Sequence, residues 1–174
     1  KALKQAVLIG YLRANPTEAC ILPRIIKKEM HPLEENQVSV FLREVQGHPH
    51  EYLYKIALFT GLRESEVLGL GWEHIDFQAG TLTVKRQLRR EQKKGGEYYF
   101  SPPKNNKSRC LTLAPSVIQL FRLQKLQQNR MRIEAGDAWE EHGLIFTNQT
   151  GGYLSYRTVY DCFKRIVRNI GAPA

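Results

Sequence analysis

The sequence has 174 residues, of which 42% are hydrophobic and 25% are charged. These values are ordinary for globular proteins and argue against a disordered chain, a collagen or a disulfide scaffold. No apolar run approaches the roughly 20 residues that a membrane-spanning helix needs, and the amphipathic first ten residues do not resemble a signal peptide. The length suits one core-bearing domain together with a fragment of a second.

The charge is strongly positive. Lys and Arg number 26 against 17 Asp and Glu, which gives a formal net charge of +9. Such an excess indicates a polyanionic partner, most often nucleic acid, although a merely basic soluble protein is the alternative. The positive charge is focused in two neighbouring segments, which contain Lys85, Arg86, Arg89, Arg90, Lys93 and Lys94, and then Lys104, Lys107 and Arg109.

Cysteine and histidine spacing gives no sign of a metal or a disulfide framework. Cys20, Cys110 and Cys162 are odd in number and far apart, so we expect reduced, buried thiols in a cytoplasmic protein. His48 and His50 flank a proline and could bind a metal, but a solvated loop is the simpler interpretation. The chain also has no G-x-x-x-x-G-K-[ST] and no H-E-x-x-H motif. The sequence therefore predicts no metal and no cofactor.

Helices are expected throughout the first half of the chain. Apolar spacing predicts a helix over residues 1–13, which Asn15-Pro16 ends. The following proline-containing and charged stretch, up to Pro32, is interpreted as a linker from an upstream domain or, alternatively, as an N-terminal arm of the main domain. Three further helices, separated by glycine-containing breaks, are predicted at residues 34–46, 51–59 and 63–70.

The apolar period then changes from that of a helix to that of a strand. Three strands joined by short polar turns, which imply an antiparallel meander, are predicted at residues 81–88, 98–100 and 109–113. A long helix is expected over residues 115–135, a short strand at 144–146, and a last helix, capped by Ser155, over 156–170. The order predicts an α+β fold that is mostly helical with one small three-stranded antiparallel sheet.

One short string combines an arginine, a glycine break and a glutamate. Arg63 follows Gly61 and opens a helix, where a guanidinium beside free backbone N–H groups is well placed to bind a phosphate. Glu66 lies about one turn later and can hold Arg63 in a single orientation. The alternative is an ordinary surface ion pair that contributes little to stability.

The string around Arg63 resembles the first signature box of the tyrosine recombinase, or phage integrase, family. The family pattern T-G-x-R-x-x-E-x-x-x-L-x-W-x-x-I-D is matched by Thr60, Gly61, Arg63, Glu66, Leu70, Trp72, Ile75 and Asp76. A second family segment places a catalytic lysine in the turn between two strands, and it is similar to Pro103, Lys104, Asn105, Lys107, Ser108, Arg109 and Leu111. The closest likeness is to integrases of conjugative transposons and temperate phages of Gram-positive bacteria.

The resemblance also implies how the chain is organised. Residues 1–30 would be the end of a core-binding domain and its linker, and residues 31–174 a catalytic domain that is C-terminally incomplete. The family carries a later H-x-x-R box and a nucleophilic tyrosine, but none of the five histidines is followed by Arg three residues on. We therefore expect the nucleophile to lie outside these residues and the chain by itself to be inactive. The candidate tyrosines are interpreted as packing residues, and they are Tyr153, Tyr156 and Tyr160.

The function implied by the resemblance is site-specific DNA recombination, for integration or excision of a mobile element, through a 3′-phosphotyrosyl intermediate and without a metal or cofactor. Arg63 would face the scissile phosphate, Glu66 would orient Arg63, and Lys104 would protonate the leaving 5′-oxygen. Double-stranded DNA would be contacted through its phosphates by Lys85, Arg86, Lys93, Lys94, Lys107 and Arg109.

The resemblance further implies a homo-tetramer on synapsed DNA, accessory DNA-bending proteins, and a DNA-associated location in the bacterial cytoplasm without a membrane partner. One alternative is a non-catalytic DNA-binding relative, but DNA binding alone requires neither Arg63 nor Lys104. Another is an RNA-binding domain, which predicts exposed aromatic residues on one sheet face. The second predicted strand contains the consecutive aromatic residues Tyr98, Tyr99 and Phe100. Because successive side chains of a strand point to opposite faces, the three cannot all share one face.

Overall fold

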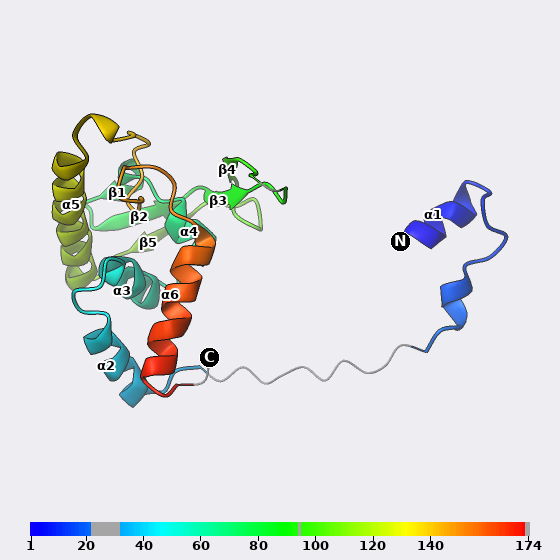
Figure 1. Cartoon of the computed structure of the whole chain (residues 1–174), viewed down its shortest axis with the longest axis horizontal. Coiled ribbons are helices and arrows are strands. Elements are labelled where there is room, and N and C mark those ends of the chain that lie inside the picture. The colour runs from blue at the N-terminus through cyan, green and yellow to red at the C-terminus, as the bar shows by residue number, and fades with distance from the viewer. Residues whose placement is uncertain (22–31, 94, 173–174) are drawn as a thin grey trace. The chain divides into compact units, whose positions relative to one another are not determined.

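The computed structural model (Figure 1) describes residues 1–21, 32–93 and 95–172. The chain divides into two compact units, Lys1–Pro32 and Leu33–Ala174. Most of the predicted linker lies outside the described residues, and the assignment of the two parts to a core-binding and a catalytic domain stays a prediction. Within the described ranges, no helix is both long and apolar enough to cross a membrane.

The smaller unit contains one short α-helix and one 3-10 helix. Helix α1 (Ala2–Leu8) is shorter than predicted, because Gly10 takes a left-handed conformation with φ of 81° that does not continue a helix. The 3-10 helix η1 (Pro16–Ala19) follows, and the Asn15 side chain caps it by accepting a hydrogen bond from the Thr17 N–H at 3.1 Å.

The helices of the larger unit lie where the sequence predicts them, with ends that differ by at most two residues. They are α2 (Glu35–Glu44), α3 (Glu51–Thr60), α4 (Glu64–Leu68), α5 (Pro115–Ala135) and α6 (Tyr156–Asn169), with short 3-10 helices η2 (Trp72–His74) and η3 (Gly136–Ala138). Gly61 separates α3 from α4 with φ of 63°. Ser155 precedes α6 as predicted, but its side chain makes no capping hydrogen bond.

The small sheet is antiparallel and three-stranded, so the α+β fold is confirmed, but the predicted meander is wrong. The sheet has the order β1-β2-β5 and consists of β1 (Ile75–Asp76), β2 (Thr81–Val84) and β5 (Arg109–Thr112). A separate two-stranded hairpin consists of β3 (Gln87–Arg90) and β4 (Tyr98–Ser101). Figure 1 shows this hairpin projecting on the side of the unit away from α5.

The predicted strand over residues 81–88 is broken by the contacts of one side chain. The alternation of apolar and polar residues continues through this stretch, but β2 ends before Lys85 and β3 begins after Arg86. The Arg86 Nε donates a hydrogen bond to the Gly69 carbonyl at 2.9 Å, and its guanidinium carbon lies 4.1 Å from the centroid of the Phe100 ring. These contacts fix the chain where it leaves one sheet for the other.

The predicted strand at residues 144–146 is also wrong. Leu144 forms only an isolated bridge with Gly71. The Ile145 carbonyl accepts hydrogen bonds from two buried side chains of α5, Gln124 Nε2 at 2.9 Å and Gln128 Nε2 at 3.2 Å. Because side chains satisfy this carbonyl, the segment needs no strand partner there.

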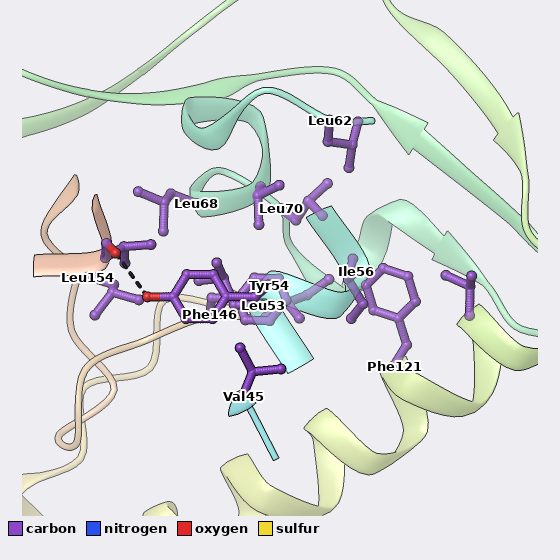
Figure 2. Close-up of a cluster of buried hydrophobic side chains, with 14 of the residues drawn as sticks. Val45, Leu53, Tyr54, Ile56, Leu62, Leu68, Leu70, Phe121, Phe146 and Leu154 are labelled. Atoms are coloured by element: carbon purple, nitrogen blue, oxygen red, sulfur yellow. Dashed lines mark hydrogen bonds between the residues drawn. The ribbon is translucent and has the colours of Figure 1, made fainter. Parts of the chain in front are cut away.

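The core of the larger unit lies between the small sheet and the helices around it (Figure 2). Ile56 of α3 and Phe121 of α5 are fully buried in it. Tyr54 packs in the same cluster and donates a hydrogen bond from its hydroxyl to the Val159 carbonyl of α6 at 2.9 Å (Figure 2). The core therefore joins α3, α5 and α6, and α4 packs against it through the buried Val67 and Leu68.

The three cysteines are free, as predicted, but the expectation that they are buried is wrong. Cys20 and Cys110 are exposed, and Cys162 is half-buried. Cys110 is exposed because it lies on the outer face of β5, which is an edge strand of the three-stranded sheet.

Candidate functional site

A buried carboxylate lies at the centre of the site. Glu66 is the third residue of α4 and is 1% exposed. Arg109 of β5 binds both carboxylate oxygens, with Nη1 2.9 Å from Oε1 and Nη2 2.7 Å from Oε2. Arg63 donates to the same carboxylate from Nη1 to Oε1 at 3.2 Å and from its backbone N–H to Oε2 at 2.9 Å. These hydrogen bonds compensate for the burial of the charge.

The local chain geometry places Arg63 at the N-terminus of α4. Gly61 ends α3 in a left-handed conformation, and the buried Leu62 side chain fixes the connection. Arg63 then adopts the extended conformation of an N-cap residue, and Glu66 reaches back to its backbone N–H. The spacing of three residues between Arg63 and Glu66 therefore brings their side chains together, as the sequence predicts.

Glu66, Arg63 and Arg109 form one charged group, the Glu66 cluster, and its electrostatics follow from this geometry. The hydrogen bonds from Arg109 lower the pKa of Glu66 to about 2, although burial acts in the opposite direction. The same pair raises the pKa of Arg109. The Arg63 side chain is 57% exposed, so more than half of its surface is open to solvent. Two positive charges and one negative charge leave the cluster with a net positive charge beside an open surface.

The predicted lysine lies on the turn between β4 and β5. Lys104 is exposed, and the preceding Pro103 is buried. The Asn106 N–H closes the turn by donating to the Pro103 carbonyl at 2.7 Å, and Asn106 takes a left-handed φ of 53°. Arg109 begins β5 a few residues later, so the strand that follows the lysine turn also carries a residue that binds Glu66.

The predicted DNA-binding residues fall into two groups. The first group is exposed to solvent and consists of Lys85, Lys93 and Lys107. Of these, Lys93 also forms an ion pair with Glu91 at 2.8 Å. Arg86 and Arg109 instead bind within the protein, Arg109 to Glu66 and Arg86 to the Gly69 carbonyl. Lys94 lies outside the described residues. A contact of any of these side chains with DNA stays a prediction.

Two functional candidates were missed by sequence reasoning. The first is Arg109 as the partner of Glu66, since it was assigned to DNA. The second is Gln87, a buried side chain that bonds both Ser65 of α4 and the Pro102 carbonyl beside the lysine turn. The signal in the sequence for Gln87 is that a polar residue stands at an inward-facing position of a predicted strand.

The three tyrosines that were interpreted as packing residues make ring contacts with other aromatic side chains. Tyr153 stacks between Tyr98 of β4, at 5.1 Å between ring centroids, and His142, at 4.6 Å. Tyr156 and Tyr160 stack on each other on the outer face of α6 and are 56% and 39% exposed.

The two arginines of the site are partly open to solvent, with side-chain exposures of 57% for Arg63 and 37% for Arg109. A hollow of about 820 Å³ does occur in this unit, but Pro49, Leu53 and Phe146 are among its lining residues, and none of the Glu66 cluster is. Among the described residues, no group of three or more His, Cys, Asp or Glu is arranged to hold a metal. An open, positively charged surface suits a long anionic partner better than a small molecule.

Comparison with known proteins identifies the family. The model of the phage integrase family matches residues 16–173. The chain therefore belongs to the phage integrase family of tyrosine recombinases, which confirms the resemblance seen in the sequence.

The relatives are considerably longer than this chain. A tyrosine recombinase XerC-like protein of Caldanaerobacter subterraneus subsp. tengcongensis is 27% identical over 97% of the chain and 47% of its own length. An integrase of Streptomyces ambofaciens is 27% identical over 97% of the chain and 44% of its own length. The Tn1549 transposon integrase, solved in complex with transposon right end DNA, has a TM-score of 0.73 and 26% identity over 97% of this chain and 54% of that one. The chain spans about half the length of the curated relatives it matches.

The low pKa of Glu66 predicts a pH-dependent stability. Because the folded pKa of about 2 is below the ordinary value of 4.5, the stabilisation by Glu66 is complete above pH 4.5 and is lost as the pH falls towards 2. A depression of this size corresponds to about 3 kcal/mol. We expect the stability advantage of the wild type over Glu66→Gln, measured by urea unfolding, to shrink between about pH 5 and about pH 3.

The matched control is Glu44→Gln, because Glu44 is an exposed carboxylate at the end of α2. This variant should show no comparable change in its stability difference over the same pH range. An advantage of the wild type over Glu66→Gln that stays constant from about pH 5 to about pH 3 would contradict the assigned ion-pair cluster.

Proposed function

We propose that this chain contributes the phosphate-binding arginine and the proton-donating lysine of a site-specific DNA recombinase. The whole protein would cut and rejoin DNA during integration or excision of a mobile element, through a 3′-phosphotyrosyl intermediate. The observation that carries the proposal is the geometry of Arg63, whose guanidinium is held by the buried Glu66 and still faces solvent. Membership of the phage integrase family and the relatives named integrase support it.

The chemistry requires a fixed positive charge at the scissile phosphate. Attack by a tyrosine hydroxyl increases the negative charge on the nonbridging phosphate oxygens, and donors that are already in place stabilise that charge without reorganisation. Arg63 meets this need because Glu66 holds one of its guanidinium nitrogens while the side chain as a whole stays 57% exposed. Arg109 binds both oxygens of Glu66, so the carboxylate does not cancel the charge of Arg63.

The leaving 5′-oxygen needs a proton, and Lys104 is our candidate for its donor. Its ammonium is exposed on a turn that follows directly on a buried proline. A lysine side chain in its ammonium form carries three N–H donors and so has a proton to give. The alternative role for Lys104 is a simple phosphate contact, which is the role we assign to Lys107.

The partner of the surface around this site would be double-stranded DNA. The whole protein would act as a homo-tetramer on synapsed DNA, with accessory DNA-bending proteins, in the bacterial cytoplasm. The Tn1549 integrase, which is similar to this chain, was solved with DNA. No histidine of these residues is followed by Arg three positions on, so we propose that the chain by itself forms no covalent link to DNA.

Phosphate contacts predict that DNA binding by this chain weakens with salt. The slope of log affinity against log salt should be about −0.9 for each phosphate that is neutralised. We expect the double variant Lys85→Ala/Lys107→Ala to flatten this slope by at most about two, because each lysine reaches one phosphate. The measurement is fluorescence anisotropy with a labelled duplex across a series of salt concentrations.

The matched control is Lys125→Ala. Lys125 lies on α5, with its ammonium 5.3 Å from the centroid of the Trp72 ring. Helix α5 lies on the side of the unit away from the β3–β4 hairpin (Figure 1). This variant should leave the slope unchanged. An affinity of the parent chain that does not depend on salt would overturn the proposed DNA surface.

The proton-donor role of Lys104 is tested with a substrate whose bridging 5′-oxygen is replaced by sulfur. A thiolate leaves without being protonated, because its conjugate acid is much stronger than an alcohol. In the whole protein, Lys104→Ala should cleave the oxygen substrate roughly a hundredfold more slowly and the sulfur substrate at close to the normal rate. Covalent adducts on a nicked suicide substrate, resolved on a denaturing gel, give both rates.

Lys107→Ala serves as the control from the same turn and should show neither the defect nor the selective recovery. If Lys104→Ala is equally slow on both substrates, the residue is not the proton donor. If the unaltered whole protein forms no adduct on its own DNA ends, the catalytic proposal fails and the non-catalytic relative is the better description.

A further inference from the structure

Gln87 is a buried amide that uses both of its ends. It opens β3 and is 5% exposed. Its Oε1 accepts a hydrogen bond from the Ser65 hydroxyl at 3.2 Å, and its Nε2 donates to the Pro102 carbonyl at 2.6 Å. A buried amide without partners is costly, so both bonds act to hold this side chain in one position.

The two partners of Gln87 belong to the two halves of the proposed site. Ser65 lies on α4 between Arg63 and Glu66. Pro102 lies two residues before Lys104, at the start of the turn that carries it. One side chain therefore connects the helix of the arginine to the turn of the lysine.

At its other end the turn runs into β5, where Arg109 binds Glu66 of α4. Two further interactions near the Pro102 end are local to the turn or to its hairpin. The Asn106 N–H bonds the Pro103 carbonyl within the turn itself, and Ser101 pairs with Gln87 across the β3–β4 ladder. Neither interaction reaches α4. In the part of the chain that the structure describes, Gln87 is the side chain whose hydrogen bonds join Pro102 to α4.

We propose that Gln87 is a positioning residue that sets the place of the Lys104 turn relative to Arg63. This inference rests on the proposed function, in which the two residues act on the same phosphate. Its physical basis is that proton transfer needs the donor within hydrogen-bond reach of the leaving oxygen. A displacement of about 1 Å is enough to lower a rate roughly a hundredfold.

The test replaces Gln87 by methionine, which keeps the length and burial of the side chain and removes both hydrogen bonds. The matched control is Gln124→Met. Gln124 is also buried, at 7% exposure, and its Nε2 donates to the Ile145 carbonyl at 2.9 Å, far along the chain from the lysine turn. Both variants lose a buried amide, so we expect similar decreases in melting temperature.

Cleavage by the whole protein distinguishes positioning from a general loss of stability. On the oxygen substrate, Gln87→Met should be slower than the wild type by roughly tenfold to a hundredfold. On the substrate with sulfur at the 5′-bridging position it should recover most of that loss, as Lys104→Ala should. Gln124→Met should show no preference between the substrates. A Gln87→Met variant that is equally slow on both, or no slower than Gln124→Met, overturns the inference.

A milder variant and a structural readout complete the design. Ser65→Ala removes one of the two bonds and should show the same substrate preference with a smaller defect. Amide hydrogen exchange of the 174-residue chain should become faster at residues 104–108 in Gln87→Met and remain unchanged there in Gln124→Met.

The two readouts separate failure of this inference from failure of the proposed function. If sulfur does not rescue Lys104→Ala, the proton-donor role is wrong, and the exchange measurement still decides whether Gln87 orders the turn. If sulfur rescues Lys104→Ala but Gln87→Met shows neither rescue nor faster exchange, the positioning role is wrong and the proposed function stands.

Discussion

The buried charge of Glu66 is the constraint on which the rest of the site depends. A carboxylate that is 1% exposed is strongly destabilising without compensation, and here two arginines provide it. One of them, Arg63, is the N-cap residue of the same helix, and the other, Arg109, is on β5. The requirement to neutralise one carboxylate therefore fixes helix α4 against the three-stranded sheet and determines where the guanidinium of Arg63 faces.

Under the proposed function, the same arrangement would serve both stability and catalysis. Arg109 binds both oxygens of Glu66, one with each terminal guanidinium nitrogen, and so compensates for the burial of the carboxylate. Arg63 donates a single side-chain hydrogen bond to the carboxylate and stays 57% exposed, so under the proposed function its guanidinium would still be open to a phosphate. Gln87 extends this rigid framework to the lysine turn through a hydrogen bond to Pro102. The result is a preorganised, positively charged surface supported by the hydrophobic core beneath α4.

Local features of the sequence predicted the parts of the fold and site that depend on local spacing. Helix periodicity located the five longer helices after residue 33, and the interval from Arg63 to Glu66 predicted their pairing. Arg109 was missed as a partner because it lies 43 residues from Glu66, and only the register of β2 against β5 brings it there. The break between β2 and β3 was missed for a similar reason, since Arg86 bonds a carbonyl 17 residues earlier.

The most direct measurement compares cleavage and binding for Arg63→Ala in the whole protein. If Glu66 holds Arg63 for the transition state, the single-turnover cleavage rate should fall roughly a hundredfold to a thousandfold while DNA affinity changes little. Arg63→Lys should recover only part of the rate, because an ammonium lacks the paired N–H donors of a guanidinium. Equal losses of rate and affinity in Arg63→Ala would contradict this and make Arg63 an ordinary DNA contact.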